Sequence, residues 1–321
     1  MESRESIEGF AGLYERIRSA IAREMIGQEQ VVENLLLCLI AGGNVLLEGV
    51  PGLGKTHLVR TLSHVLDLPF SRVQFTPDLM PTDITGTHVL ERNGEGTAFV
   101  FRRGPLFASL VLADEINRAT PKTQSALLEA MQEHAVTVGG ETYAMEEPYF
   151  VLATQNPLEQ EGTYPLPEAQ LDRFLMKILV PFPSLSELKD IVHLHAGEGG
   201  EKVAGGEDIL RMRRIAREVP VASAVEESAL RLVLRTHPEL PDAPECARKY
   251  LRYGASPRAA QAILATARVR ALHEGRFNVS FEDIRKVAPP CLRHRLAMSF
   301  DGITAGKNTD DVIQELLEDL C

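Results

Sequence analysis

Residues 49–56 have the types and the spacing needed to hold a chain of phosphate groups. They read Gly49-Val50-Pro51-Gly52-Leu53-Gly54-Lys55-Thr56, which matches the P-loop pattern Gly-x-x-x-x-Gly-Lys-Thr. Glycine tolerates positive φ, so successive backbone N–H groups can converge on phosphate oxygens at a helix N-terminus. Lys55 adds a positive charge, and the hydroxyl of Thr56 is suited to bind Mg²⁺. We therefore predict a nucleoside triphosphate site at Gly49, Pro51, Gly52, Leu53, Gly54, Lys55, Thr56 and His57.

The residues on either side of this motif support the prediction. Residues 45–48 form a short apolar run that is typical of a buried strand. After the motif, apolar residues recur at helical spacing at Leu58, Leu62, Val65 and Leu66. A P-loop requires a strand before it and a helix after it, so this context argues against a chance glycine-rich turn.

A second chemical element, Asp114-Glu115, follows the apolar run 109–113. Strand ends in a parallel sheet face ligands at the carboxyl edge, where Asp114 can hold Mg²⁺ and Glu115 can polarise the attacking water. Taken alone, the pair would be ordinary acidic charge at a helix N-terminus. Together with the P-loop, it indicates a metal ligand and a general base.

The composition is that of a soluble enzyme with a main domain and a smaller one. The chain has 321 residues, of which 44% are hydrophobic, and a net charge of −11 from 34 Lys+Arg and 45 Asp+Glu. This acidic balance argues against a surface that coats nucleic acid or binds anionic membranes, although a local basic patch stays open. The four cysteines lack Cys-x-x-Cys spacing, which favours reduced thiols and a cytoplasmic location: Cys38, Cys246, Cys291 and Cys321. No apolar run is long enough for a membrane span, and we find no signal peptide.

The first part of the chain alternates helical and strand-like patterns. We expect helices over 13–24 and about 29–41, and a further helix that starts at Thr120-Pro121. The remaining strand-like runs are 69–75, 149–154 and 177–180, and we expect the last of these to pair with 149–154. Turn residues between short alternating runs predict two β-hairpins, over 88–101 and 136–143.

Beyond Pro183 we find only helical patterns, so we place a domain break there and assign residues 1–182 to an α/β domain and 183–321 to a helical one. Ser280 and Asp283 form a capping box for a helix over 281–288, which we expect Pro289-Pro290 to interrupt. A C-terminal helix is predicted from apolar residues in register, Ile313, Leu316, Leu317 and Leu320.

Several further strings resemble a known family in their order along the chain. The P-loop, the strand-end pair, Leu171-Asp172-Arg173-Phe174 and Ser256-Pro257-Arg258 are similar to motifs of AAA+ ATPases. Among the AAA+ ATPases, the chain resembles the MoxR family in particular. Four strings carry this resemblance: Gly104-Pro105-Leu106-Phe107, Ala153-Thr154-Gln155-Asn156-Pro157, the run 162–174 and Leu292-Arg293-His294-Arg295-Leu296. The resemblance covers roughly residues 10–300.

The resemblance implies roles for residues outside the P-loop. Asn156 is similar to the sensor-1 residue, which orients the attacking water or reports on the γ-phosphate. Arg173 resembles the arginine finger that one subunit inserts into its neighbour's site, and Arg258 resembles sensor 2 of the lid. Ile26 and Gly27 match the segment that lines the adenine pocket. Gln74 stands where relatives carry a polar residue that restrains the general base, although a strand-end Gln is usually just solvated.

The same resemblance implies an α/β fold, with an AAA+ core built on a parallel sheet, two inserted β-hairpins that face the ring pore, and an all-α lid domain. It implies a homo-oligomeric ring, most often a hexamer, that binds ATP and Mg²⁺ between subunits. Family members act as chaperone-like activators that mature a client protein or insert a metal or cofactor. They commonly work with a partner that carries a von Willebrand factor A domain.

Three other classes of protein share part of this pattern. A P-loop kinase or GTPase needs no finger arginine or sensor asparagine, and the GTPase string Asn-Lys-x-Asp is absent. A nucleic-acid motor of the helicase or loader type is the main alternative, opposed by the acidic balance and by the lack of a recognisable DNA-binding module beyond residue 183. A ring that does not hydrolyse ATP is opposed by the intact Lys55, Asp114 and Glu115.

Overall fold

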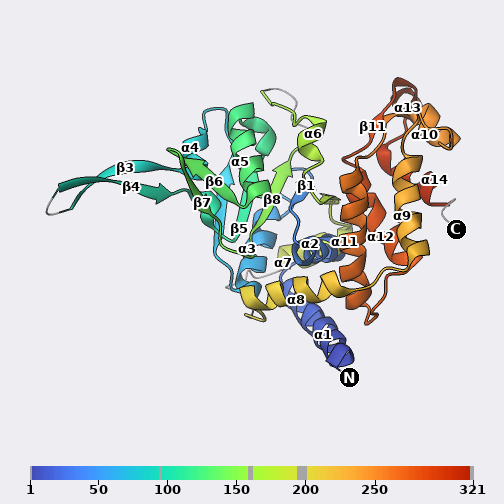
Figure 1. Ribbon diagram of the computed structural model, residues 1–321, viewed down its shortest axis with the longest axis horizontal. Coiled ribbons are helices and arrows are strands. Elements are labelled where there is room, and N and C mark those ends of the chain that lie inside the picture. Colours follow the sequence, from blue (N-terminus) through green and yellow to red (C-terminus); the bar gives the residue numbers. More distant parts are fainter. Residues whose placement is uncertain (1, 94–95, 158–161, 194–200, 319–321) are drawn as a thin grey trace.

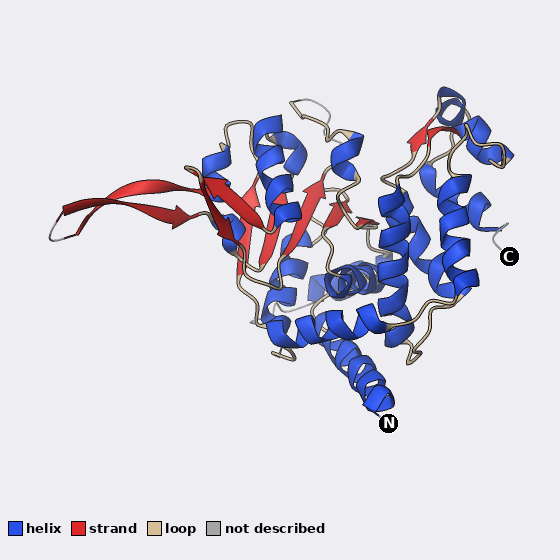
Figure 2. Ribbon diagram, in the orientation of Figure 1, coloured by secondary structure: helices blue, strands red, loops and turns tan. Residues whose placement is uncertain are grey.

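A five-stranded parallel sheet forms the centre of the α/β part (Figures 1 and 2). The computed structural model describes residues 2–93, 96–157, 162–193 and 201–318. The strand order is β2-β5-β8-β1-β9, and every pairing in the sheet is parallel. The strands are β1 (Val45–Glu48), β2 (Phe70–Gln74), β5 (Leu110–Asp114), β8 (Phe150–Gln155) and β9 (Met176–Leu179).

We expected the strand at 177–180 to pair with the one at 149–154, and this prediction is wrong. β9 pairs with β1, with Val45 opposite Met176, and β1 lies between β9 and β8. In a parallel sheet each crossover leaves the chain free to return on either side, so succession in sequence does not determine which strands are neighbours.

Alternate residues of the central strands enter two different hydrophobic clusters, as the two-residue period of a strand requires. In β5, Leu110 and Leu112 pack on one face while Val111 and Ala113 pack on the other. The first face is covered by α1 (Glu2–Ala22), α2 (Glu29–Ala41) and α3 (Lys55–Leu66), and the second by α5 (Pro121–Glu133). Because both faces are covered, the strands read as continuous apolar runs.

Most of the expected helices are found at their predicted places. The helix expected over 13–24 starts earlier, because polar residues with good helix propensity, such as Glu8, extend it toward the N-terminus. The segment 77–87 contains the short helix α4 (Pro81–Thr85). Short turns of helix complete this part as η1 (Pro105–Phe107), η2 (Ile116–Arg118) and α6 (Glu168–Leu171).

Both predicted hairpins are present. β3 (Gly86–Asn93) and β4 (Gly96–Arg103) pair antiparallel, with Leu90 opposite Phe99, and extend far from the body of the molecule (Figure 1). The turn residues 94–95 lie outside the described part of the chain. The second hairpin, β6 (Ala135–Val138) and β7 (Glu141–Ala144), turns at Gly139-Gly140, where both φ angles are positive.

After β9 the chain is almost entirely helical. Its helices are α7 (Leu185–His193), α8 (Gly206–Glu218), α9 (Ser223–Arg235), α10 (Glu245–Tyr250), α11 (Pro257–His273), α12 (Phe281–Leu292), α13 (Phe300–Thr304) and α14 (Thr309–Glu318). The expectation of helices alone needs one correction, because β10 (Leu251–Tyr253) and β11 (Ala297–Met298) form a small antiparallel pair. Runs of two or three residues are too short to show a strand period in sequence.

The predicted interruption of α12 is also wrong. The Ser280–Asp283 capping box starts the helix as expected, but the helix continues through Pro289-Pro290 to Leu292. Pro290, Cys291 and Leu292 are buried there, and this burial offsets the two missing N–H donors. In α14, Ile313, Leu316 and Leu317 are buried as predicted, while Leu320 lies outside the described residues.

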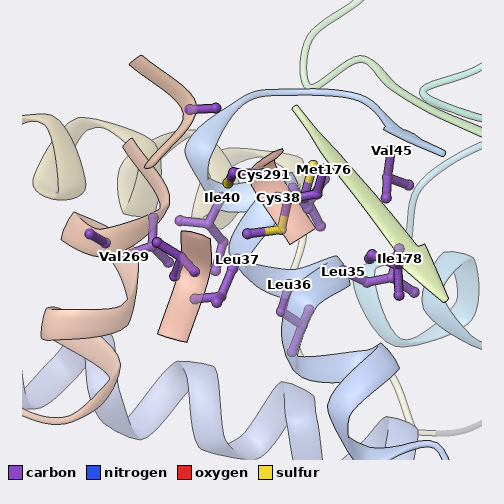
Figure 3. Packing of buried hydrophobic residues seen from close by; sticks show 14 of the residues in the cluster. Leu35, Leu36, Leu37, Cys38, Ile40, Val45, Met176, Ile178, Val269 and Cys291 are labelled. Carbon is purple, nitrogen blue, oxygen red and sulfur yellow. The ribbon is translucent and has the colours of Figure 1, made fainter. Parts of the chain in front are cut away.

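A single buried cluster joins the α/β part to the helical part (Figure 3). Cys38 of α2, Met176 of β9 and Val269 of α11 all belong to it. Helix α2 contacts both β9 and α11, so it mediates between the sheet and the helices that follow. The helical part is therefore not connected by a linker alone, because it shares apolar packing with the core.

Candidate active site

A cavity of about 400 Å³ opens at the carboxyl edge of the sheet, where β1, β2, β5 and β8 all end. Each of these strands contributes at least one residue to it, directly or through the loop that follows. Its lining consists of Pro51, Gly52, Gly54, Lys55, Thr56, Arg72, Gln74, Asp114, Glu115 and Asn156. The P-loop, the strand-end carboxylates and Asn156 are thus brought together by parallel strands that end at one edge.

The P-loop has the backbone that phosphate binding requires. Gly52 and Gly54 have φ of 86° and 75°, and helix α3 begins at Lys55 immediately after them. A side chain at Gly49 would be crowded, because an added Cβ would lie 3.0 Å from the carbonyl oxygen of Val180. The Lys55 Nζ donates to the carbonyl of Gly49 at 2.6 Å. Burial lowers the pKa of Lys55, opposed by the nearby carboxylates of Asp114 and Glu115.

Asp114 is fixed by two neighbours on adjacent strands. Its Oδ1 accepts from the Thr154 hydroxyl at 2.7 Å, and its Oδ2 accepts from Arg72 at 2.7 Å. The same Thr154 hydroxyl accepts the backbone N–H of Glu115 at 2.8 Å, so one side chain of β8 positions both acidic residues. The bonds from Arg72 and Thr154 orient the carboxylate while it lines the cavity.

Glu115 lies in the left-handed region, with φ of 56°, which only a few non-glycine residues occupy. Its Oε2 accepts from Gln74 Nε2 at 2.8 Å and from Arg118 Nη1 at 2.9 Å. Gln74 is therefore bonded to the general-base candidate, as the resemblance suggested, and Arg72 bonds in turn to Gln74 at 3.0 Å. This network holds Glu115 by one of its two oxygens.

A second cavity of about 260 Å³ lies on the other side of the P-loop and shares Gly52 and Gly54 with the first. Its walls are mainly apolar, which suits a purine base: Glu24, Met25, Ile26, Gln28, Gly52, Leu53, Gly54, His57, Phe182, Pro183, Leu188 and Ile191. The predicted base-pocket residue Ile26 lies in this wall. Gly27 adjoins it with φ of 71°, and a Cβ there would come within 2.4 Å of the Glu187 carboxyl group.

The side chain of Gln28 fits a base with an amino group. It is 7% exposed, and its Nε2 donates to the carbonyl of Leu53 at 2.9 Å. Among the described residues its Oε1 has no hydrogen-bond partner. A buried amide oxygen without a donor is costly, and the 6-amino group of adenine supplies a donor. The residue types in the first cavity also fit Mg²⁺, because Thr56 and Asp114 offer the oxygen ligands that this ion prefers.

Arg173 and Arg258, the two predicted arginines, are not among the described residues that line the two cavities. Arg173 follows α6 and its side chain is exposed. Arg258, in the first turn of α11, lies with Nη1 3.5 Å from Oδ2 of Asp172. The isolated chain therefore holds the phosphate-binding groups and the carboxylates together, without these two arginines.

Sequence reasoning missed several residues of the site. Arg72 could have been found, because it lies two positions before Gln74 and a strand places such residues on the same face. Phe182, Leu188 and Ile191 carry no chemical signature and join the base cavity only through folding. Gln28 likewise became notable only when its burial and its bond to the P-loop were known.

No group of three or more His, Cys, Asp or Glu side chains in the described ranges could hold a metal ion by itself. Within the same residues, no helix is both long and apolar enough to pass through a lipid bilayer.

Comparisons with known proteins agree with this geometry. The profile of the ATPase family associated with various cellular activities (AAA) matches residues 44–176, and the AAA lid domain matches residues 244–316. The chain is 43% identical to Chaperone MoxR1 of Mycobacterium tuberculosis, over 95% of this chain and 81% of that protein. It is 33% identical to Protein MoxR of Methylorubrum extorquens, over 88% and 86% of the two chains. A crystallised protein of Cytophaga hutchinsonii that is described as an ATPase superimposes with a TM-score of 0.91 at 37% identity, over 99% of this chain and 97% of that one.

Proposed function

Because the chain belongs to the MoxR family of AAA+ ATPases, we propose that it hydrolyses ATP as a homo-oligomeric ring, most often a hexamer in this family, and uses the energy to remodel a client protein. ATP hydrolysis itself follows from the family and from the ATPase fold. The ring and the client are the parts that we propose. We keep the division into a nucleotide-binding domain, 1–182, and a lid, 183–321, as part of this proposal.

One observation supports the ring above all others. The cavity holds Lys55, Asp114 and Glu115 together, while the exposed Arg173 of the same chain lies outside it. Phosphoryl transfer places negative charge on the γ-phosphate oxygens, and an arginine supplied by a neighbour is a common way to stabilise it. A ring of identical subunits places the Arg173 of one subunit at the cavity of the next.

The residues of the two cavities divide the tasks of this reaction between them. The P-loop N–H groups and Lys55 bind the phosphates, and Ile26, Gly27, Leu53 and His57 surround the base. Glu115 accepts a proton from water as the water oxygen attacks the γ-phosphorus and the bond to the bridging oxygen breaks, which releases ADP and phosphate. Asn156 orients that water. Thr56 and Asp114 would hold Mg²⁺, which supplies charge neutralisation on the phosphates.

Arg258 is proposed as the link between the nucleotide and the lid. It lies at the start of α11, whose Ser256 cap bonds Asp172. When Arg258 turns to the γ-phosphate it must leave Asp172, so nucleotide binding and lid position are coupled. Release of phosphate reverses this change and rotates the lid.

The client is proposed to be a protein. The relatives named Chaperone MoxR1 and Protein MoxR favour a protein client over the nucleic-acid alternative. We extend to this chain the family's association with a von Willebrand factor A domain partner and its role in maturation or in metal or cofactor insertion. Three described cysteines are free and buried, Cys38, Cys246 and Cys291, which supports a reducing, cytoplasmic environment.

The Glu115→Gln variant tests this function. It keeps the size and polarity of the side chain but removes the base, so we expect ATP binding to persist while turnover falls by a factor of about a hundred or more. The variant should form stable rings in ATP and retain its client. Phosphate release, nucleotide affinity and particle mass are the measurements, with Glu226→Gln on the exposed face of α9 as the matched control. Normal turnover in Glu115→Gln would refute the assigned base, and tight ATP binding without rings would refute the assembly.

A further inference from the structure

The segment Arg293-His294-Arg295, which follows α12, binds the backbone that carries Arg173. These three side chains belong to the helical part of the chain, yet they donate to carbonyl groups between residues 172 and 177 of the α/β part. The site described above does not use this segment. It is nonetheless a dense set of polar contacts between the two parts of the molecule.

Arg295 uses all five of its N–H donors. Its Nε donates to Asp172 Oδ1 at 2.8 Å, and its Nη2 donates to the carbonyls of Asp172 at 3.0 Å and Phe174 at 2.7 Å. Its Nη1 donates to the carbonyl of Leu175 at 3.2 Å and to that of Cys291. The side chain is 3% exposed, so the fixed fork of the guanidinium is fully committed. The carbonyls on both sides of Arg173 therefore share one donor nitrogen.

The two neighbouring residues reinforce this grip. His294 Nε2 lies 2.9 Å from the Phe174 carbonyl and the ring is buried, while Arg293 Nη1 donates to the Lys177 carbonyl at 3.1 Å. Burial holds the pKa of His294 well below its usual range, so the ring is neutral and donates from Nε2. A single segment of the lid thus binds the backbone after Arg173 at the carbonyls of Phe174, Leu175 and Lys177.

Asp172, directly before Arg173, also binds the start of α11. The hydroxyl of Ser256 donates to both carboxylate oxygens, at 2.8 and 2.9 Å, and Arg258 lies 3.5 Å from Oδ2. The helices α11 and α12 pack against each other, so Asp172 is held from both ends of this pair. The side chain of Arg173 is not part of these contacts and is exposed. Its backbone N–H donates to the Gln170 carbonyl at 3.2 Å.

We propose that Arg295 is a positioning residue for Arg173: by clamping the backbone of residues 172–175, it makes the arginine finger of each subunit move with that subunit's own lid. Rotation of the lid after hydrolysis in one site then shifts Arg173 in the neighbouring site, which gives the ring a direct path for communication. The inference rests on the proposed function, because it requires Arg173 to act in the next subunit.

Mixed rings separate this role from a general structural one. One subunit type carries Lys55→Ala and supplies a finger without hydrolysing ATP, and the other carries Arg173→Ala and supplies a nucleotide site. We then add Arg295→Lys, which keeps the charge but loses the fork, to either type. Added to the finger donor, it should lower the activity of the mixture by about tenfold or more. Added to the nucleotide-site subunit, it should change activity by less than about twofold.

The matched control is Arg213→Lys in α8. Arg213 is also a buried arginine, which donates to the Leu39 carbonyl at 3.1 Å and to Glu147 at 2.8 Å, away from Arg173. Arg213→Lys should change the activity of the mixture equally, whether it is added to the finger donor or to the nucleotide-site subunit. Equal loss from both placements of Arg295→Lys would overturn the positioning role. A reference mixture without any activity would instead show that Arg173 does not act in trans, and the positioning role would fall with that assignment.

A readout without catalysis covers variants that assemble poorly. Amide hydrogen exchange of residues 172–176 in the nucleotide-free protein should be about tenfold faster in Arg295→Lys than in the wild type, and unchanged in Arg213→Lys. Asp172→Asn, which keeps the shape of the side chain but removes its charge, should increase exchange in the same segment. Unchanged exchange there in both Arg295→Lys and Asp172→Asn would contradict the proposed clamp.

Discussion

The side-chain amide of Gln28 has one polar atom that is bonded within the protein and one that can bind the nucleotide base. Its Nε2 is bonded to Leu53 of the P-loop, while its Oε1 lies in the wall of the base cavity without a partner among the described residues. The amide is oriented by the Leu53 carbonyl, which can only accept. An adenine 6-amino group can therefore donate to Oε1, whereas the 6-oxo group of guanine would repel it.

This arrangement predicts how the protein distinguishes nucleotides. ATP should bind about five- to tenfold tighter than purine riboside triphosphate, which lacks the 6-amino group. Gln28→Met removes the oxygen that accepts from the 6-amino group, so the ratio of the two affinities should fall to about one. Loss of the bond to Leu53 lowers the affinity for both nucleotides equally and does not change this ratio. Calorimetric or fluorescence titration measures the ratio. Gln124→Met removes a comparably buried amide outside this cavity and should preserve it. A ratio that survives in Gln28→Met would rule out the assigned contact.

At this scale, contiguous motifs were predictable and isolated partners were not. Residues 49–56 and Asp114-Glu115 are recognisable because their chemistry needs adjacent positions. Thr154, which positions both Asp114 and Glu115, was visible in sequence only as part of a family string. The roles that we assign to Asn156, Arg173 and Arg258 stay predictions.

Among the elements, the segment that follows α12 contains His294, a titratable group whose protonation opposes folding. Burial depresses the pKa of His294, and neighbouring Arg295 depresses it further. Well above the ordinary histidine pKa of about 6.5, the residue is neutral in both the folded and the unfolded chain, so it has no effect on the pH dependence there. As the pH falls below that value, the unfolded chain takes up a proton on this residue while the folded chain does not.

The free energy of unfolding should therefore decrease as the pH is lowered from about 7 to about 5.5. The contribution of His294 has a limiting slope of about 1.4 kcal/mol per pH unit. Urea unfolding at several pH values in this window measures the slope. His294→Gln keeps a donor for the Phe174 carbonyl but does not titrate, so its slope should be smaller. An identical slope in the variant would show that this histidine does not titrate on unfolding.

The positions of helices and strands could be predicted where the alternation of apolar residues was long enough, or where a capping pair marked the start of a helix. The hairpin β3–β4 and the start of α12 are such cases. The β1–β9 pairing was missed because strand succession does not determine neighbours in a parallel sheet, and the continuation of α12 through Pro289-Pro290 was missed because tertiary burial overrides propensity. Leu90 and Phe99 lie opposite each other on the hairpin β3–β4 and are both exposed.

Across the whole molecule, the lid and the α/β part are joined in two physically different ways. Apolar packing around α2 forms one continuous cluster, and the polar clamp around Asp172 ties the lid to the segment that carries Arg173. The base cavity likewise combines Met25 and Ile26 with Leu188 and Ile191, from opposite sides of the proposed domain boundary. Nucleotide binding between such parts is expected to influence their relative position.

We propose that a single subunit lacks a group needed for hydrolysis, because Arg173 lies outside the cavity of its own subunit. ATP turnover per subunit should therefore depend on assembly. The most direct test measures phosphate release and particle mass together over a wide range of protein concentrations. Turnover per subunit should be negligible where the protein is monomeric and should rise in proportion to the fraction in rings. A monomer that hydrolyses ATP as fast as the assembled protein would contradict this proposal.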